Sequence, residues 1–116
     1  MIAGIGLDIV EIKRIKGVAE RQKKFVDRIL TPYEKDIYEG LSEKRKIEFL
    51  AGRYASKEAY AKAVGTGIGK HLSFLDIQVE SDQNGKPFIR LPKENGVHLS
   101  ITHSTEYAVA QVIIEK

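Results

Sequence analysis

The spacing of apolar residues changes from a helical to an alternating period near residue 70. From Glu11 to about Leu30, apolar side chains recur at the spacing of an amphipathic helix. These side chains are Ile12, Ile15, Val18, Phe25, Val26 and Ile29. Before them, residues 1–10 form an almost unbroken apolar run rich in Ile and Val. Such a run is typical of a buried strand.

Capping residues predict two further helices. Thr31-Pro32-Tyr33-Glu34 combines a capping box with a proline at the first helical position, and Gly40 ends this short helix. Ser42 is expected to cap a longer helix that runs to Val64 and ends at Gly65.

The second half of the chain has the period of β-strands. Four segments alternate between apolar and polar residues: 74–82, 87–91, 97–103 and 107–114. Asn84-Gly85 between the first two favours a type I′ hairpin, and Ser104-Thr105 is the expected junction of the last two. The sequence predicts an α+β fold in one domain over residues 1–116, with helices followed by an antiparallel meander that the first strand joins.

Composition restricts the possible chemistry. The chain is 42% hydrophobic and 30% charged, which is ordinary for a folded domain. It contains no Cys, which excludes disulfides, thiolate metal sites and a cysteine nucleophile. Asp8 interrupts the first apolar run, and no stretch is long enough to cross a bilayer. We therefore expect a cytoplasmic protein without a membrane partner.

Positive charge is concentrated in one segment. Residues 13–28 hold seven bases and two acids, whereas the first twelve residues carry two acids and the remaining 88 are balanced. Arg14, Arg21 and Arg28 are seven apart and share one helical face, with Phe25 close beside it. This pattern favours docking of an acidic protein. No recognition motif or cluster of stacking aromatic residues supports a nucleic acid partner.

Asp8 is the first candidate for chemistry. It stands near the end of the predicted strand, after Gly4 and Gly6, which let other groups approach the backbone closely. A carboxylate in this position has little conformational freedom. The alternative is that Asp8 only caps the following helix.

Glu58 and Lys62 form the second candidate, four residues apart on one helical face. An exposed Glu–Lys pair would explain this spacing and would contribute only about 0.3 kcal/mol. Small residues surround the pair, which is what a helix packed closely beneath a site requires. These residues are Ala55, Ala59, Ala61 and Ala63.

The glycine-rich segment and the histidines carry weaker signals. Residues 65–70 (Gly-Thr-Gly-Ile-Gly-Lys) could offer backbone donors to a phosphate, although they follow a helix and match no P-loop. Helix termination followed by a loop is the better interpretation. The three histidines lack zinc-site spacing. His103 lies among hydroxyl residues, either as a satisfied polar edge or as a contact to a ligand phosphate.

Taken together, the two acidic motifs resemble the signature of the phosphopantetheinyl transferases. Ile5-Gly6-Leu7-Asp8 is followed about fifty residues later by Tyr54-Ala55-Ser56-Lys57-Glu58-Ala59, then Lys62 and Gly65. The chain length and the segments Asn84-Gly85-Lys86-Pro87 and Ser100-Ile101-Thr102-His103 resemble the short carrier-protein-synthase branch. Tyr54 is a departure, since Phe or Trp is usual there.

The resemblance implies roles for individual residues. Asp8 and Glu58 would bind Mg²⁺, with Mn²⁺ as a possible substitute, and these two with Lys62 would be catalytic. Lys62 would neutralise the diphosphate of coenzyme A. We expect Glu58 to act as the base, directly or through a metal-bound water, because it alone pairs an acid with the reacting phosphate. The other expected coenzyme contacts are Arg53, Gly65, Asn84, Pro87 and His103. The expected contacts with an acidic carrier protein are Arg14, Arg21, Lys24, Phe25 and Arg28.

The implied activity is transfer of 4′-phosphopantetheine from coenzyme A to a serine of apo-acyl carrier protein, with release of 3′,5′-ADP, in fatty acid biosynthesis. The family is trimeric, with sites between subunits, and each chain corresponds to one half of longer relatives. Two other functions fit the residues. One is a basic adaptor that binds through residues 13–28 without a metal, and the other is a phosphohydrolase that uses the same carboxylates with water as acceptor.

Overall fold

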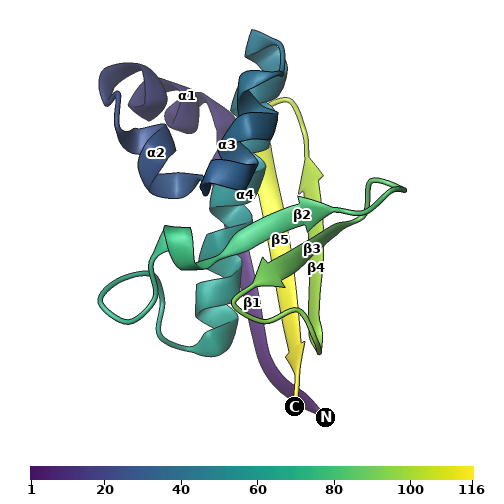
Figure 1. The fold of residues 1–116 in the computed structure, drawn as a ribbon. Helices are drawn as coiled ribbons and strands as arrows, with labels where there is room; N and C mark the ends of the chain where they lie inside the picture. Colours follow the sequence, from purple (N-terminus) through teal and green to yellow (C-terminus); the bar gives the residue numbers. More distant parts are fainter.

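A long helix, α4, lies at the centre of the fold, with shorter helices and two antiparallel sheets around it (Figure 1). The computed structural model describes residues 1–116. In chain order the elements are β1 (Ile2–Glu11), α1 (Ile12–Arg21), α2 (Phe25–Ile29), α3 (Pro32–Glu39), α4 (Glu43–Val64), the 3₁₀ turn η1 (Phe74–Asp76), β2 (Gln78–Ser81), β3 (Pro87–Leu91), β4 (Val97–His103) and β5 (Tyr107–Glu115). The predicted α+β class is confirmed.

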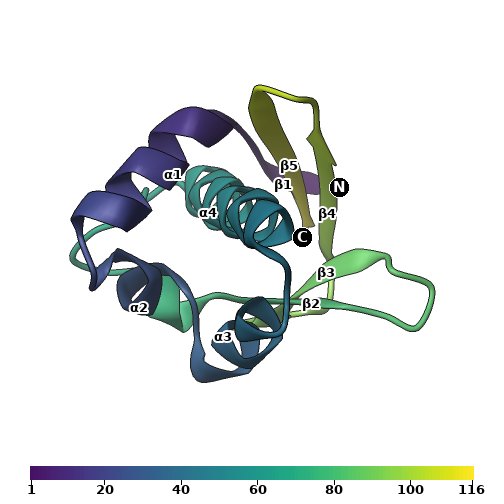
Figure 2. The same ribbon diagram turned by 90° about the horizontal axis from the view of Figure 1, so that it is seen from above.

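The helix boundaries set by capping residues are also confirmed. The hydroxyl of Ser42 accepts a hydrogen bond from the Arg45 N–H at 3.4 Å, and Gly65 ends α4 with φ of +103°. The capping box of Thr31 and Glu34 is formed in both directions. Seen end-on in Figure 2, α4 is surrounded by α1, α2, α3 and the strands. No helix is long and apolar enough to span a membrane.

Strand β1 joins a three-stranded sheet in the order β1-β5-β4, as predicted. Only one of its faces is buried. Gly6 and Val10 face α4, whereas Ile5, Leu7 and Ile9 are 60%, 56% and 63% exposed on the other face. The expectation of a strand buried on both sides is therefore wrong for this chain, because no element of the chain covers the outer face of the sheet.

The inner face of β1 lies directly on the backbone of α4. A Cβ atom added to Gly4 would lie 2.0 Å from the carbonyl oxygen of Ala63, and one added to Gly6 would lie 1.8 Å from that of Ala59. No side chain can occupy either position without moving the strand. These glycines therefore set how closely β1 approaches α4.

The predicted helix over residues 11–30 is wrong in one respect, since it is two helices joined by a turn at 22–24. Gln22 has extended dihedral angles, and its side-chain oxygen accepts a hydrogen bond from Arg28 at 2.8 Å across the turn. The apolar period marks the buried positions, but it does not report a bend between them. The turn changes the direction of the chain, so that α1 and α2 both pack beside α4 (Figure 2).

The second half contains two sheets where one meander was predicted. β2 and β3 form a separate two-stranded sheet, because the loop at 92–96 turns the chain before β4 begins. Residues 74–76 are a 3₁₀ turn rather than the start of a strand. The hairpin at 82–86 is confirmed, but the type I′ prediction is wrong, because Gly85 alone has a positive φ (+83°) and type I′ needs two such residues.

We predict that Gly6→Ala destabilises the protein by about 3 kcal/mol, because the added methyl group meets a backbone carbonyl that cannot rotate away. Thermal unfolding should show the midpoint falling by about 10 °C. Gly69→Ala is the matched control, since no heavy atom lies within 4 Å of the added carbon. Equal melting temperatures for the two variants would show that the β1–α4 contact can yield.

Candidate active site

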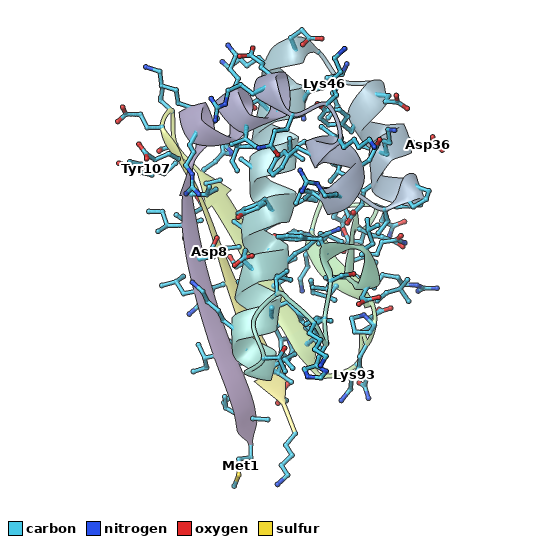
Figure 3. The ribbon with its side chains drawn as sticks, turned by 90° about the vertical axis from the view of Figure 1, so that its left-hand side faces the viewer. Met1, Asp8, Asp36, Lys46, Lys93 and Tyr107 are labelled. Carbon is cyan, nitrogen blue, oxygen red and sulfur yellow. The ribbon has the colours of Figure 1, made fainter.

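Asp8, Glu58 and Lys62 meet where β1 crosses α4. Asp8 is on the same face of β1 as Gly4 and Gly6, so the close contact of the strand with the helix carries its carboxylate onto α4 (Figure 3). The ammonium of Lys62 lies 3.1 Å from an Asp8 carboxylate oxygen and donates to the Leu7 carbonyl at 3.0 Å. Two motifs about fifty residues apart in sequence thus form one charged cluster.

Burial and charge both act on Glu58. Loss of water raises the pKa of the Glu58 carboxyl above its ordinary value, the negative charge of Asp8 raises it further, and Lys62 opposes both effects. The two carboxylates are therefore close enough to repel each other. Such repulsion is relieved when a cation lies between them.

Neither structural alternative from the sequence describes these residues. Lys62 pairs with Asp8 and forms no ion pair with Glu58. The N-cap of α1 is Glu11, and no side chain makes a capping hydrogen bond there, so Asp8 does not cap this helix. The cluster is therefore a tertiary contact between β1 and α4, not a local interaction within either element.

The donor set fits a hard divalent cation with mixed ligands. Nowhere do three or more His, Cys, Asp or Glu side chains gather as they would in an all-protein metal site. Asp8 and Glu58 offer two carboxylates. Mg²⁺ is commonly held by one or two carboxylates, with phosphate oxygens and waters completing an octahedron. The pair could hold such an ion together with a phosphorylated ligand.

Aromatic rings line the side of the cluster nearest the basic helices. Tyr54, one turn before Glu58, stacks on Phe74 with ring centroids 5.3 Å apart and contacts Phe25 of α2 at 6.1 Å. Burial and the charge of Glu58 raise the pKa of the Tyr54 phenol, and Arg14 acts in the opposite direction. The charges of Glu58 and Arg14 therefore both act on Tyr54.

A second candidate region is a cavity of about 420 Å³ between α3, α4, β4 and the hairpin at 82–86. Arg53 and His103 both line it, together with Gly85, the neighbour of Asn84. The Arg53 guanidinium lies 4.1 Å from the centre of the Phe49 ring, and its buried Nε has no hydrogen-bond partner. Burial lowers the pKa of Arg53. An unpaired buried donor of this kind is suited to an acceptor on a ligand.

Sequence reasoning missed further polar residues of this region. Arg45 and Glu48 line the cavity, Glu48 lies 4.0 Å from His103, and Lys44 lies beside them in a smaller hollow. The signal was present as the basic run Lys44-Arg45-Lys46. The net charge of residues 29–116 does not reveal this run, because acidic residues elsewhere in that stretch cancel its positive charge.

The structure does not bring all predicted site residues together in one chain. The cavity is lined by none of Asp8, Glu58 and Lys62. Arg53 and Glu58 are five residues apart on α4, which turns them about 140° from each other around the helix axis. Gly65 ends α4, and Pro87 begins β3 without lining the cavity. One chain therefore presents two separate polar regions, the Asp8–Lys62–Glu58 cluster and the cavity at Arg53.

The predicted carrier contacts lie on α1, the turn and α2. Arg14, Arg21, Lys24 and Arg28 are all exposed, and Phe25 is half-buried against Tyr54. The break at 22–24 removes the single-helix spacing that was predicted for the three arginines. The Arg28–Gln22 hydrogen bond nevertheless keeps Arg28 next to the end of α1.

Comparison with known proteins shows the family of the chain. The sequence model of the 4′-phosphopantetheinyl transferase superfamily matches residues 4–112. The chain is 63% identical to the holo-[acyl-carrier-protein] synthase of Bacillus subtilis, over all of this chain and 98% of the relative. The Bacillus pumilus synthase is 61% identical over the same shares.

Solved structures of the same family resemble the fold of this chain. A holo-(acyl-carrier-protein) synthase from Bacillus anthracis in complex with CoA (3′,5′-ADP) superposes with a TM-score of 0.94 at 55% identity, covering 100% of this chain and 98% of that one. The Helicobacter pylori synthase in complex with coenzyme A has a TM-score of 0.81 at 37% identity, covering 96% and 99%. The chain belongs to the 4′-phosphopantetheinyl transferase superfamily.

Proposed function

We propose that this chain transfers 4′-phosphopantetheine from coenzyme A to a serine of apo-acyl carrier protein and releases 3′,5′-ADP. The contact of Asp8, Lys62 and Glu58 across β1 and α4 carries the proposal, because it joins the two motifs that the family shares. Full-length similarity to the holo-[acyl-carrier-protein] synthases supports the same reaction. Residues 1–116 act as one domain, in cytoplasmic fatty acid biosynthesis.

Asp8 and Glu58 would hold Mg²⁺, or Mn²⁺ in its place, and the cation would neutralise charge that develops on the diphosphate. In the reaction, the serine oxygen bonds to the β-phosphorus of coenzyme A while the bond to the bridging oxygen breaks. The bridging oxygen leaves with 3′,5′-ADP, and Glu58 accepts the serine proton. Lys62 stabilises the phosphoryl oxygens electrostatically.

The nucleotide end of coenzyme A fits the cavity beside Arg53. Four side chains in this region suit a phosphorylated nucleoside: Arg53 with its unpaired Nε, His103, Lys44 and Arg45. Asn84 and Pro87 flank this cavity, whereas Gly65 belongs to the end of α4 near Lys62. Because Arg53 and Glu58 lie about 140° apart around α4, we infer that each site combines the Asp8–Glu58 cluster of one subunit with the Arg53 cavity of a neighbour.

The outer face of the β1-β5-β4 sheet supports such an assembly. Ile5 lies opposite Ile113, and Ile9 lies opposite Val109, so apolar side chains of two strands share this face. Figure 3 shows side chains of β1 that project away from α4 on this side. An exposed apolar face of this kind marks an interaction surface. We infer that copies of this chain cover it in a homotrimer.

The carrier protein would dock on α1 and α2. Their exposed bases, Arg14, Arg21, Lys24 and Arg28, suit an acidic helix, and Phe25 supplies an apolar contact beside them. Phe25 packs on Tyr54, one turn before Glu58, so the docking surface lies beside the helix that carries the carboxylate cluster.

We predict that the carrier gains the mass of phosphopantetheine when it is mixed with the protein, coenzyme A and Mg²⁺, and that EDTA abolishes the gain.

Glu58→Gln should lower kcat about 100- to 1,000-fold while the fold and carrier binding persist. Glu94→Gln, at an exposed loop position, should match the parent. Free 3′,5′-ADP without carrier gain would instead indicate a hydrolase, and full turnover of Glu58→Gln would contradict both roles of Glu58.

We predict that Arg21→Ala raises KM for the carrier about tenfold and leaves kcat within about twofold, because it removes a docking charge and no group near the phosphate. The effect should shrink at high salt, where exposed charges are screened. Arg90→Ala is the control, since Arg90 is an exposed arginine on β3. Equal KM values for the two variants would place the docking surface elsewhere.

We predict that Ile5→Glu gives a folded but inactive monomer, because a carboxylate on the outer face of the sheet prevents its burial between subunits. Light scattering during gel filtration should give three times the 13.0 kDa chain mass for the parent and one chain mass for the variant. Leu75→Glu is the control, at a leucine that is 48% exposed outside the sheet, and it should stay trimeric. An active parent that is monomeric at assay concentration would exclude shared sites.

A further inference from the structure

Lys57, the residue before Glu58, is completely buried and paired. Its ammonium lies 2.6 Å from a Glu34 carboxylate oxygen, and neither side chain is accessible to solvent. It also donates to the carbonyl of Ile29 at 2.6 Å and to that of Phe74 at 3.1 Å. All three hydrogens of the ammonium therefore have acceptors, which come from α2, α3 and η1.

The Glu34 carboxylate is equally well bonded. One oxygen accepts from the Thr31 N–H at 2.8 Å as well as from Lys57, and the other accepts from the Val79 N–H at 2.7 Å. The pair thus joins the end of α2, the start of α3, the middle of α4, η1 and β2. No other charged pair in the chain is fully buried.

Stability alone does not explain a pair of this kind. Removing two charges from water costs about as much as their attraction returns, and apolar replacements of similar volume are often neutral or better. What the pair does enforce is geometry, because each hydrogen bond fixes the position of a backbone carbonyl or N–H. Lys57 fixes the last carbonyl of α2, at Ile29.

A second contact holds the other end of α2. The Phe25 ring, at the first residue of α2, packs on Tyr54 of α4, which in turn stacks on Phe74. The carbonyl of Phe74 is itself an acceptor of Lys57. α2 is therefore attached to α4 at both ends, within one turn of Glu58. Without these attachments a helix of five residues would not stay formed.

We propose that Lys57 is a positioning residue for the carrier protein, because it holds α2 against α4 at a fixed place relative to Glu58. The inference rests on the proposed function, in which α2 carries Phe25 and Arg28 of the docking surface. With α2 held, the docking groups are preorganised, and binding does not have to order them. Asp8 and Glu58 depend instead on the β1–α4 contact.

The test is the double variant Glu34→Gln/Lys57→Met, which removes both charges and so leaves neither one buried and unpaired. We expect the dissociation constant and KM for apo-carrier to rise about tenfold, with kcat at saturating carrier within about threefold and coenzyme A affinity within about twofold of the parent. Val97→Ala, a core substitution in β4, controls for general loss of stability and should change neither affinity.

The milder second variant is Glu34→Gln/Lys57→Gln, which also leaves no buried charge unpaired and whose amide at position 57 can still donate toward the carbonyls of Ile29 and Phe74. Its carrier affinity should lie between those of the parent and of Glu34→Gln/Lys57→Met. Carrier affinity within twofold of the parent in either folded variant would overturn the proposal. Equal losses of carrier and coenzyme A affinity would also overturn it, because they indicate a general structural role.

Arg21→Ala separates this inference from the proposed function. If Arg21→Ala leaves carrier binding unchanged, the assigned docking surface is wrong, and the proposal about Lys57 falls with it. If Arg21→Ala weakens carrier binding and the Lys57 variants do not, the docking surface stands and only the positioning role is wrong. Hydrogen exchange of the α2 amides should accelerate in Glu34→Gln/Lys57→Met when the attachment is lost.

Discussion

Strand β1 lies on helix α4 with backbone against backbone, and the carboxylate cluster depends on this contact. Gly4 and Gly6 leave no atom between the strand and the carbonyl oxygens of Ala63 and Ala59. Because Asp8 is two residues beyond Gly6 on the same face, the contact delivers its carboxylate to Lys62 and close to Glu58. A strand held further away by side chains would leave the acids on separate elements. The charge repulsion between them is therefore built into the packing, and a bound cation would relieve it.

Helix α4 organises everything else because it faces a different partner on each side. One face receives β1 and presents Glu58 and Lys62, a second face lines the cavity at Arg53, and a third buries Lys57 against α2, α3 and η1. Small residues such as Ala55, Ala59 and Ala63 permit the close approach on these sides. Asp8, Glu58 and Lys62 do not line the cavity at Arg53, so the two polar regions of one chain lie on different sides of α4. The outer face of the sheet stays apolar and exposed.

The basic segment is attached to this helix by an aromatic contact and by a hydrogen bond from Lys57 to a backbone carbonyl. Its own charged side chains take no part in the attachment. Phe25 packs on Tyr54, and the last carbonyl of α2 accepts from Lys57, so a very short helix carries Arg28 in a fixed position. Arg14 and Arg21 are exposed and make no side-chain hydrogen bond or ion pair within the chain, whereas Arg28 donates to Gln22 across the turn. The groups that attach α2 to α4 are the Phe25 ring and the Ile29 carbonyl, not the basic side chains. Positive charge can therefore accumulate in this segment without loss of the fold.

Local patterns in the sequence predict the α+β class, the caps at Thr31 and Ser42, the end of α4 at Gly65 and the two acidic motifs, because each depends on neighbouring residues or on spacing along one element. They do not show the bend at 22–24, the separate β2–β3 sheet or the pairing of Lys57 with Glu34. These features are decided by contacts between elements far apart in the chain, which no local period records. Periodicity identified Ile5, Leu7 and Ile9 as apolar, but only the tertiary structure showed that nothing in the chain covers them.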